Sequence, residues 1–510
     1  MKTKYYITTA ISYPNGPPHM GHAYEAIATD AIARYHRLAG EDVFFLTGTD
    51  EHGMKIARAA EKTGMTPQDY VDGMAETFLD MCAQLNISND RFVRTTDPGH
   101  HACAQELWRR MDANGDIYLG RYEGWYSVRD EAFYDEKELV ACEGGEKLSP
   151  EGTPVEWTVE ESYFFRLSAY GDKLLKLYED NPDFIQPASR RNEMANFIKG
   201  GLRDLSISRT SFDWGVPVPD APDHVMYVWL DALSNYLSGV GYPDNVYKER
   251  WPADLHVIGK DVVRFHSIYW PAFLMSAGIE LPRAVFGHGF VLLDGQRMSK
   301  SQGNVVDPLA LAETYGTDQL RYFLLREVPF GGDGSYSEAA IVQRSNSDLA
   351  NDLGNLAQRC LSMIAKNCGG EIPEPKAPIK LDSVLEMDMS NLPNEVDKAM
   401  RSNAIHSALE SIWKMVGDTN AYFAKREPWA LKKTDPEAMG SVLYRTADIV
   451  RRLSILAQPA IPEGAGRLLD QLGVSPLDRD FDSIGKSLKP GTVLPAPSGV
   501  FPRFDPPAEV

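Results

Sequence analysis

The chain has 510 residues, of which 43% are apolar and 24% charged, and its formal net charge is −20. These proportions are those of a globular protein with about three domains, and they exclude a disordered chain and a small scaffold held by disulfides. The 5 cysteines are scattered and no apolar leader precedes Pro14, which predicts a cytoplasmic protein. No apolar run approaches ~18 residues, so we expect no membrane span. Because phosphate contacts need cations, RNA binding by so acidic a chain requires a local basic site.

Residues 1–115 alternate strand-like and helix-like segments. Residues 5–10 are rich in β-formers and lead into the turn-prone residues 14–18. Apolar residues then recur at helical spacing, namely Met20, Ala23, Tyr24, Ile27, Ala31, Tyr35 and Leu38. Gly40 ends this predicted helix, and residues 43–47 follow as a buried strand. The strand–helix–strand order predicts a right-handed parallel crossover, the unit of a doubly wound, Rossmann-like α/β sheet.

Three further regions differ in character. Residues 116–224 combine aromatic segments with a polar Gly-rich stretch, which predicts a β-rich insertion between two halves of the sheet. The α/β pattern resumes over residues 225–345, where residues 255–259 form a strand that runs into a turn. Residues 346–510 begin with a helical apolar stripe, and they predict a separate all-α domain with a C-terminal tail.

A first motif, Pro18-His19-Met20-Gly21-His22, lies between the first predicted strand and the first helix. His19 and His22 are three residues apart, so they share one helical face. In a first turn they lie beside free N–H groups that favour a phosphate, and Gly21 lets a flat base approach the backbone. Taken alone, the motif is better explained as two surface histidines near a helix start.

A second motif, Arg297-Met298-Ser299-Lys300-Ser301, follows the strand end and tight turn of residues 292–295. A mobile loop with two cations suits a triphosphate whose leaving oxygens gain charge. Taken alone, this motif is better explained as an ordinary basic surface loop. The occurrence of both motifs, in this order and context, indicates a shared function.

The two motifs resemble the HIGH-type and KMSKS-type signatures of class I aminoacyl-tRNA synthetases. Further segments resemble the methionyl-tRNA synthetase family: Thr9-Ala10-Ile11-Ser12-Tyr13-Pro14-Asn15-Gly16, Gly48-Thr49-Asp50-Glu51-His52-Gly53, Val228-Trp229-Leu230-Asp231-Ala232, and Ile258-Gly259-Lys260-Asp261 with Phe265-His266-Ser267. The resemblance runs from about residue 5 to about residue 460. It implies the class I catalytic fold with a connective insertion and a C-terminal anticodon-binding domain.

The resemblance implies a methionine site with two parts. Asp50 would pair with the ammonium group through a charge-assisted hydrogen bond; the alternative for this aspartate is a helix cap. A largely aromatic pocket would take the polarizable thioether, and it would comprise Ile11, Tyr13, Trp229, Ala232, Tyr236 and His266. The alternative for these side chains is plain core packing.

The resemblance also implies an ATP site made of His19, Gly21, His22, Gly259, Asp261, His288, Val291 and Lys300. Asp261 would accept hydrogen bonds from the ribose hydroxyls, Lys300 would neutralise the pyrophosphate, and Mg²⁺ would bridge the phosphates. The catalytic residues would be His19, His22, Lys300 and Arg297. The family often has lysine where this chain has Arg297, whose planar fork differs in geometry.

The implied reaction has two steps. The methionine carboxylate attacks the α-phosphate of ATP, which gives methionyl-adenylate and pyrophosphate. A ribose hydroxyl of the terminal adenosine of tRNA(Met), the initiator included, then takes the methionyl group for use in translation initiation and elongation. Catalysis would come from alignment and charge stabilisation, without a covalent protein intermediate.

The predicted helical domain holds a candidate anticodon site. Asn355 and Arg359 are four residues apart on one helical face, and Trp429 follows a proline and the basic pair Lys425-Arg426. The resemblance implies that they read the anticodon, with Trp429 stacking on a base. The alternatives are a buried polar role for Asn355 and a core role for Trp429.

Two departures from the family concern metal and assembly. Many relatives bind zinc through paired cysteines in the insertion, but the matching stretch here is Ser127-Val128-Arg129-Asp130 with Cys142 as the nearby thiol. One thiol does not build a tetrahedral site, so we expect no structural zinc. Some relatives also carry a C-terminal dimerising module; this chain ends in the Pro-rich residues 494–510, which favours a monomer.

Three other functions fit parts of the pattern. A synthetase for leucine, isoleucine or valine would need a large editing insertion, and one for cysteine a thiolate-bound zinc. A small-molecule adenylyltransferase would share the first motif but would not need the helical domain. A non-catalytic tRNA-binding protein would not need His19, His22 and Lys300.

Overall fold

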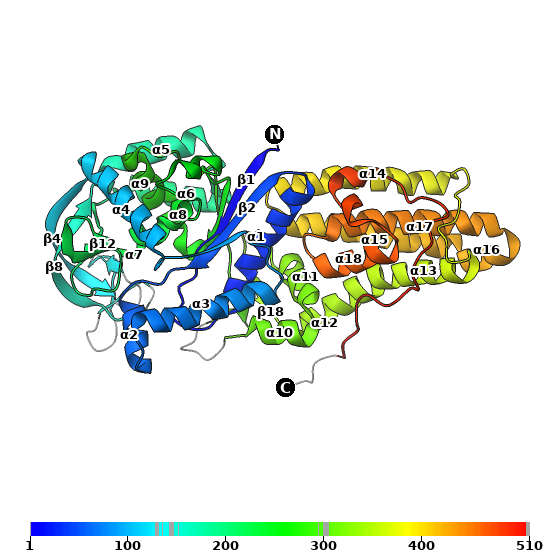
Figure 1. Ribbon diagram of the computed structural model, residues 1–510, viewed down its shortest axis with the longest axis horizontal. Coiled ribbons are helices and arrows are strands. Elements are labelled where there is room, and N and C mark those ends of the chain that lie inside the picture. Colours follow the sequence, from blue (N-terminus) through cyan, green and yellow to red (C-terminus); the bar gives the residue numbers. More distant parts are fainter. Residues whose placement is uncertain are drawn as a thin grey trace.

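The computed structural model describes residues 2–127, 132–134, 136–141, 147–150, 152–293, 295–298 and 305–505. The molecule is elongated, with a sheet-containing half and a helical half, and its first strand and first helix lie between the two (Figure 1). In these described ranges no helix is both long and apolar enough to cross a membrane.

A parallel sheet organises the first half. Among the described residues it contains six strands in the order β3-β2-β1-β14-β15-β9. Their bounds are β1 (Lys4–Thr9), β2 (Asp42–Thr49), β3 (Arg91–Arg94), β14 (Leu255–Gly259), β15 (Val285–His288) and β9 (Ile185–Gln186). Strand β1 pairs with β2 on one side and β14 on the other, so the chain winds outward in both directions from this point. The predicted doubly wound sheet is confirmed, and the crevice at such a switch point is where ligands bind.

Helix α1 (Met20–Leu38) forms the first crossover, between β1 and β2. Every residue from 26 to 33 in this helix is buried, because one side lies on the sheet and another meets helices of the second half. The other helices around this part of the sheet are α2 (Met54–Thr63), α3 (Pro67–Gln84), α4 (Pro98–Ala113) and α9 (Trp270–Ala277).

The predicted β-rich insertion follows α4. Its largest feature is the antiparallel pair β4 (Ile117–Ser127) and β8 (Glu156–Phe165). Shorter elements complete it: β5 (Ala132–Tyr134), β6 (Val140–Ala141), β7 (Lys147–Leu148), α5 (Gly171–Asp180), α6 (Ala188–Lys199), β10 (Leu205–Ser206), β11 (Ser208–Arg209), β12 (Pro217–Val218) and β13 (Ala221–Met226). Strand β9 also lies in this stretch, so the insertion supplies an edge strand of the main sheet, which the sequence analysis did not predict.

Beyond β15 the chain forms a small sheet of β16 (Val291–Leu293), β17 (Gln296–Arg297) and β18 (Gly334–Tyr336). Helices α10 (Pro308–Tyr315), α11 (Thr317–Glu327) and α12 (Glu338–Arg344) lead to η6 (Ser345–Gly354), a π-helical segment. The helical half contains α13 (Asn355–Asn367), α14 (Lys380–Arg401), α15 (Ile405–Arg426), α16 (Pro428–Thr434), α17 (Pro436–Ala457) and α18 (Pro462–Gln471).

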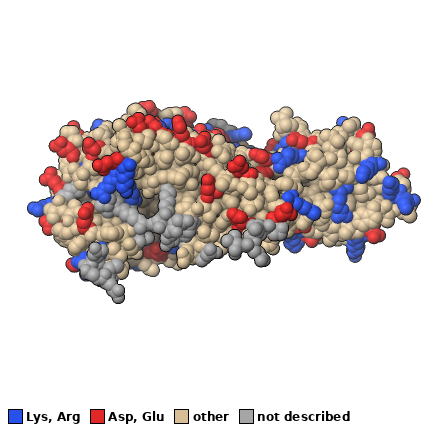
Figure 2. Space-filling view, turned by 90° about the horizontal axis from the view of Figure 1, so that it is seen from below, with Lys and Arg blue, Asp and Glu red and all other residues tan. Residues whose placement is uncertain are grey.

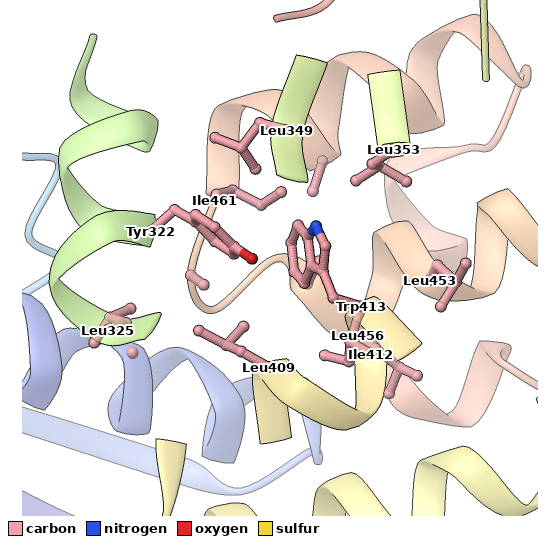
Figure 3. Close-up of a cluster of buried hydrophobic side chains, with 14 of the residues drawn as sticks. Tyr322, Leu325, Leu349, Leu353, Leu409, Ile412, Trp413, Leu453, Leu456 and Ile461 are labelled. Atoms are coloured by element: carbon pink, nitrogen blue, oxygen red, sulfur yellow. The ribbon is translucent and has the colours of Figure 1, made fainter. Parts of the chain in front are cut away.

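One hydrophobic core runs through both halves. Figure 3 shows Tyr322 and Leu325 of α11 facing side chains of η6, α15 and α17. The rings of Tyr322 and Trp413 lie 4.4 Å apart, and both donate hydrogen bonds to Asp348. The helical region, which the sequence predicts as a separate domain, therefore shares its packing with α1 and α11.

Candidate active site

A cavity of about 470 Å³ opens at the carboxyl ends of β1 and β14. This volume is within the range of small-molecule and cofactor sites. The lining includes every methionine-site and ATP-site residue predicted from the sequence apart from Lys300: Ile11, Tyr13, His19, Gly21, His22, Asp50, Trp229, Ala232, Tyr236, Gly259, Asp261, His266, His288 and Val291. The fold thus brings together side chains that lie up to 280 positions apart, from Ile11 to Val291.

His19 and His22 start helix α1 as a reciprocal pair. His19 is the N-cap, and its Nδ1 accepts a hydrogen bond from the Gly21 amide at 3.1 Å. The Nδ1 of His22 accepts from the His19 amide at 3.2 Å, and the two rings stack 3.8 Å apart. Because both Nδ1 atoms accept, each neutral ring carries its proton on Nε2. The pair therefore supplies two N–H donors beside the positive end of a helix.

The structure gives a second reason for glycine at position 21, besides the close approach of a base to the backbone. A Cβ atom at this position would lie 2.9 Å from Cε1 of His19. The absent side chain therefore gives the His19 ring room to fold back over the helix start. This contact is tighter than side chains normally tolerate, so the cap geometry itself favours glycine.

Asp50 lies at the end of β2 and is only 8% exposed. Its backbone N–H donates to Ser12 O at 2.9 Å, which joins the segment after β2 to the segment after β1 that carries Ile11 and Tyr13. The N-cap of the next helix, α2, is Gly53. The alternative of a helix cap for Asp50 is therefore wrong.

Trp229 and Ala232 lie on α7 (Val228–Leu233), and Tyr236 lies on α8 (Asn235–Ser238). The Trp229 ring stacks on Phe265 at 3.6 Å with an interplanar angle of 5°. Phe265 belongs to η4 (Phe265–Tyr269), a π-helical turn that also carries His266. The sequence analysis names Phe265 in a family-like segment with His266 but gives it no role in the site.

His266 and Tyr236 form the buried base of the cavity. The His266 Nδ1 faces Val262 O at 3.0 Å, so it carries the ring proton, and Nε2 accepts from the Tyr236 hydroxyl at 2.6 Å. Burial lowers the pKa of His266 to about 4. The imidazole is therefore neutral near pH 7, and this part of the cavity suits an uncharged side chain.

The opposite part of the cavity is polar. His288 Nε2 lies 2.9 Å from Glu25 Oε2, and its Nδ1 lies 2.8 Å from Gly289 O. Burial opposes protonation, but the hydrogen bond and charge of Glu25 raise the pKa of His288. Glu25 was not predicted, although it is three residues after His22 and so shares its helical face.

Gly259 and Asp261 lie at the end of β14. A Cβ at Gly259 would lie 2.6 Å from Asp261 Oδ1, so this glycine leaves space for the Asp261 carboxylate. The Asp261 side chain is exposed at the cavity rim, where a ribose could reach it.

The second motif begins at the edge of the same cavity. Strand β17 pairs with β16 through Leu292 and Arg297, and Met298 lines the cavity. Lys300 lies outside the described residues, as does the side chain of Arg297. The last described residue before Lys300 thus belongs to the cavity that contains the histidine pair.

Two of the predicted anticodon residues, Arg359 on α13 and Trp429 on α16, lie together at the far end of the helical half (Figure 1). The Arg359 guanidinium lies 5.0 Å from the Phe423 ring centre and 5.6 Å from that of Trp429. Trp429 is 45% exposed and Asn355 is also exposed, so the alternatives of a core aromatic and a buried polar residue are wrong. Figure 2 shows Lys and Arg side chains spread over this end. A local group of cations is what RNA binding by an acidic chain requires.

In the described parts of the chain no group of three or more His, Cys, Asp or Glu side chains is placed to hold a metal ion. Cys142 and residues 128–130 lie outside the described residues. The expectation of no structural zinc stays a prediction.

Comparisons with known proteins agree with this architecture. The family model "tRNA synthetases class I (M)" matches residues 5–361, and "Anticodon binding domain of methionyl tRNA ligase" matches residues 372–506. A methionine–tRNA ligase of Mycobacterium tuberculosis is 58% identical over 510 residues, covering 99% of this chain and 98% of the relative. One from Brucella suis is 59% identical over 508 residues, with coverage of 99% and 98%.

Solved structures give the same result. The M. tuberculosis methionyl-tRNA synthetase in complex with methionyl-adenylate matches with a TM-score of 0.97 at 58% identity, covering 99% of this chain and 100% of that one. Its apo form matches with a TM-score of 0.91 at 55% identity, with 99% coverage of both chains. The switch-point cavity and the helical anticodon-binding region define a class I aminoacyl-tRNA synthetase. Within that class, the chain belongs to the methionyl-tRNA synthetase family.

Proposed function

We propose that the cavity activates L-methionine with MgATP and that the methionyl group then passes to tRNA(Met), the initiator included. One observation carries the proposal: the His19–His22 pair, Asp50 and the Tyr236–His266 pair line one cavity. These three features suit, in turn, a phosphate, an ammonium group and an uncharged side chain.

Methionine would lie between Asp50 and the aromatic part of the cavity. The Asp50 carboxylate would accept charge-assisted hydrogen bonds from the ammonium group. The thioether would contact Trp229, Tyr236 and His266, since sulfur is attracted to aromatic rings by about 0.3–1.5 kcal/mol per contact. Ile11, Tyr13 and Ala232 would complete this pocket.

ATP would occupy the polar part, with its ribose at Asp261 and its base near Gly259, His288 and Val291. A methionine carboxylate oxygen would attack the α-phosphorus, forming the new P–O bond as the α–β bridge bond breaks and pyrophosphate leaves. The Nε2–H groups of His19 and His22, together with Lys300 and Arg297, would stabilise the charge on the phosphoryl oxygens. Mg²⁺ would enter with the nucleotide, held mainly by phosphate and water.

In the second step a ribose hydroxyl of the terminal adenosine would attack the adenylate carbonyl, with AMP as the leaving group. The anticodon would contact Asn355, Arg359 and Trp429, where the exposed indole presents a stacking face next to a guanidinium. We further propose that the enzyme is a monomer and acts in the cytoplasm, where charged tRNA is used.

Pyrophosphate exchange into ATP, measured with each standard amino acid in turn, tests the proposal. Methionine should support exchange, and Asp50→Asn should raise the KM for methionine by at least about tenfold while changing the KM for ATP little. Exchange driven best by another amino acid, or absent with methionine, would refute it.

A further inference from the structure

A fully buried carboxylate lies behind the methionine part of the cavity. Asp231, on α7, is 0% exposed, and each of its oxygens faces one histidine. His52 Nδ1 lies 2.7 Å from Oδ2, and His100 Nε2 lies 2.8 Å from Oδ1. Three segments therefore meet at one side chain: α7, the turn after β2 and the start of α4.

The charge state of this cluster follows from its geometry. Burial would raise the pKa of Asp231, but the two imidazoles outweigh burial and hold that pKa well below its usual value. An ionised carboxylate can only accept, so both histidines donate to it. The His100 Nδ1 in turn lies 2.9 Å from the Ser238 hydroxyl on α8. The cluster is thus a hydrogen-bond network centred on the Asp231 carboxylate, which accepts at both oxygens, and this network fixes the positions of its members.

Both ends of the Asp231–His52 contact adjoin cavity residues. His52 is two residues after Asp50, and Asp231 lies between Trp229 and Ala232 on the same short helix. The turn is also held by the Tyr13 hydroxyl, which donates to His52 O at 2.9 Å, and by Trp214 Nε1, which donates to Glu51 O at 2.7 Å. The contact between His52 and Asp231 connects this turn to the helix that carries the side-chain pocket.

We propose that Asp231 is a positioning residue that sets the separation between the carboxylate of Asp50 and the side-chain pocket formed by Trp229 and Ala232. It makes no contact with substrate. Through this separation it selects amino acids whose ammonium group reaches Asp50 while the side chain reaches the pocket of Trp229 and Ala232. This inference rests on the proposed role of Asp50 as the ammonium ligand.

The test compares two inhibitors of methionine-dependent pyrophosphate exchange. Methioninol has both the ammonium group and the thioether side chain, whereas 4-(methylthio)butan-1-ol has the side chain without the ammonium group. In Asp231→Asn one histidine N–H faces an amide NH₂ instead of a carboxylate. We expect the inhibition constant of methioninol to rise about tenfold, because one hydrogen bond to a charged group is lost from the contact that joins the Asp50 turn to α7. The inhibition constant of the des-amino alcohol should stay within about twofold.

Two further variants separate the explanations. Asp448→Asn removes a buried carboxylate that binds Arg451 and Arg452 in the helical half, so it matches the loss of a buried charge; both inhibition constants should stay at the wild-type values. His100→Gln replaces the rigid imidazole with a flexible amide at a residue that does not line the cavity, so it loosens the contact with Asp231 Oδ1 while keeping the carboxylate; it should shift methioninol in the same direction by less. If Asp231→Asn does not fold, His100→Gln decides the question.

An equal loss of affinity for both inhibitors, in Asp231→Asn or in His100→Gln, would overturn the proposal, because it would show a general collapse of the pocket. Unchanged affinity for both would overturn it as well. Asp50→Asn tests the underlying role independently: if it leaves the ratio of the two inhibition constants unaltered, Asp50 is not the ammonium ligand, whatever Asp231→Asn shows.

Discussion

The imidazole rings of His19 and His22 stack 3.8 Å apart, and each residue satisfies a backbone N–H at the start of α1 through its Nδ1. The capping bonds thereby leave the ring proton of both neutral histidines on Nε2. The same two side chains form the helix cap and, in the proposed function, donate hydrogen bonds to phosphate, so substitutions must be chosen to separate the two roles.

His19→Asn achieves this separation. Asparagine is a good N-cap, so the helix start is retained, but the ring and its Nε2–H are lost. We expect the kcat of pyrophosphate exchange to fall by about 10²-fold, as for removal of one donor to a developing charge. The melting temperature should change little. A variant with wild-type kcat would show that His19 acts only as a cap.

Lys300→Ala should slow adenylate formation by about 10²–10³-fold, because it removes a cation from the leaving pyrophosphate. Methionine affinity, measured by equilibrium dialysis without ATP, should stay within about twofold. Lys300→Arg retains the charge and should recover part of the rate. Equal effects on rate and on methionine binding would contradict the assigned role.

Trp429→Ala should raise the KM for tRNA in aminoacylation by about tenfold or more, since stacking on one base contributes about 1–3 kcal/mol. Pyrophosphate exchange, which does not involve tRNA, should be unaffected. Trp157→Ala is a matched control, because Trp157 is 54% exposed on the insertion. An unchanged KM for tRNA in Trp429→Ala would refute the anticodon role.

His266 predicts a loss of stability in acid. Its pKa is about 4 in the folded protein against an ordinary value of 6.5, so the unfolded chain takes up a proton first as the pH falls. The neutral ring makes its full contribution to the free energy of unfolding above pH 6.5. That contribution falls by about 3 kcal/mol in total as the pH is lowered towards 4. Urea unfolding should therefore show a smaller drop between pH 7.5 and 4.5 in His266→Gln than in the wild type.

Tyr236→Phe is the control for this experiment. This substitution removes the hydroxyl that donates to His266 but keeps the titrating ring. The stability that Tyr236→Phe loses relative to the wild type should therefore be similar at pH 7.5 and at pH 4.5. The same drop in His266→Gln as in the wild type would show that this histidine does not carry the effect.

Metal analysis of the purified protein should find much less than one equivalent of zinc per chain, because the insertion offers one cysteine where a structural site needs four ligands. Treatment with EDTA followed by added Mg²⁺ should restore full exchange activity. A full equivalent of zinc would show that ligands other than paired cysteines hold it.

The sequence predicted the site better than it predicted the packing. His19, Asp50 and Asp261 each follow a strand of the parallel sheet, and the carboxyl ends of such strands meet at one edge, so local pattern and topology were sufficient. The family resemblance supplied residues without a local signal, such as His288 and Val291. His100 was not singled out and His52 was given no role, because a buried contact such as that of His100 with Asp231, over 131 positions, has no sequence period.

Other features were also beyond sequence reasoning. Strand β9 has two residues, too few for an alternating pattern, and its pairing with β15 depends on the tertiary fold. The π-helical turn at Phe265–Tyr269 has no known sequence signature, although it sets the direction of His266. One sequence signal was available and unused: residues 26–33 are apolar at six of eight positions, a pattern typical of a helix covered on more than one side, and all eight residues are buried.

The packing of Tyr322 against Trp413, and the hydrogen bonds from Arg321 to Pro459 O at 2.9 Å and to Ala460 O at 3.2 Å, have a practical consequence for dissecting the enzyme. A chain cut near residue 345 would lose the partners of Tyr322 and Leu325 and would present their apolar surface to water. Such a fragment should aggregate, so its inactivity would say nothing about whether adenylate formation needs the anticodon helices. Point substitutions at the distal end, rather than truncation, are the way to assign activities to each half.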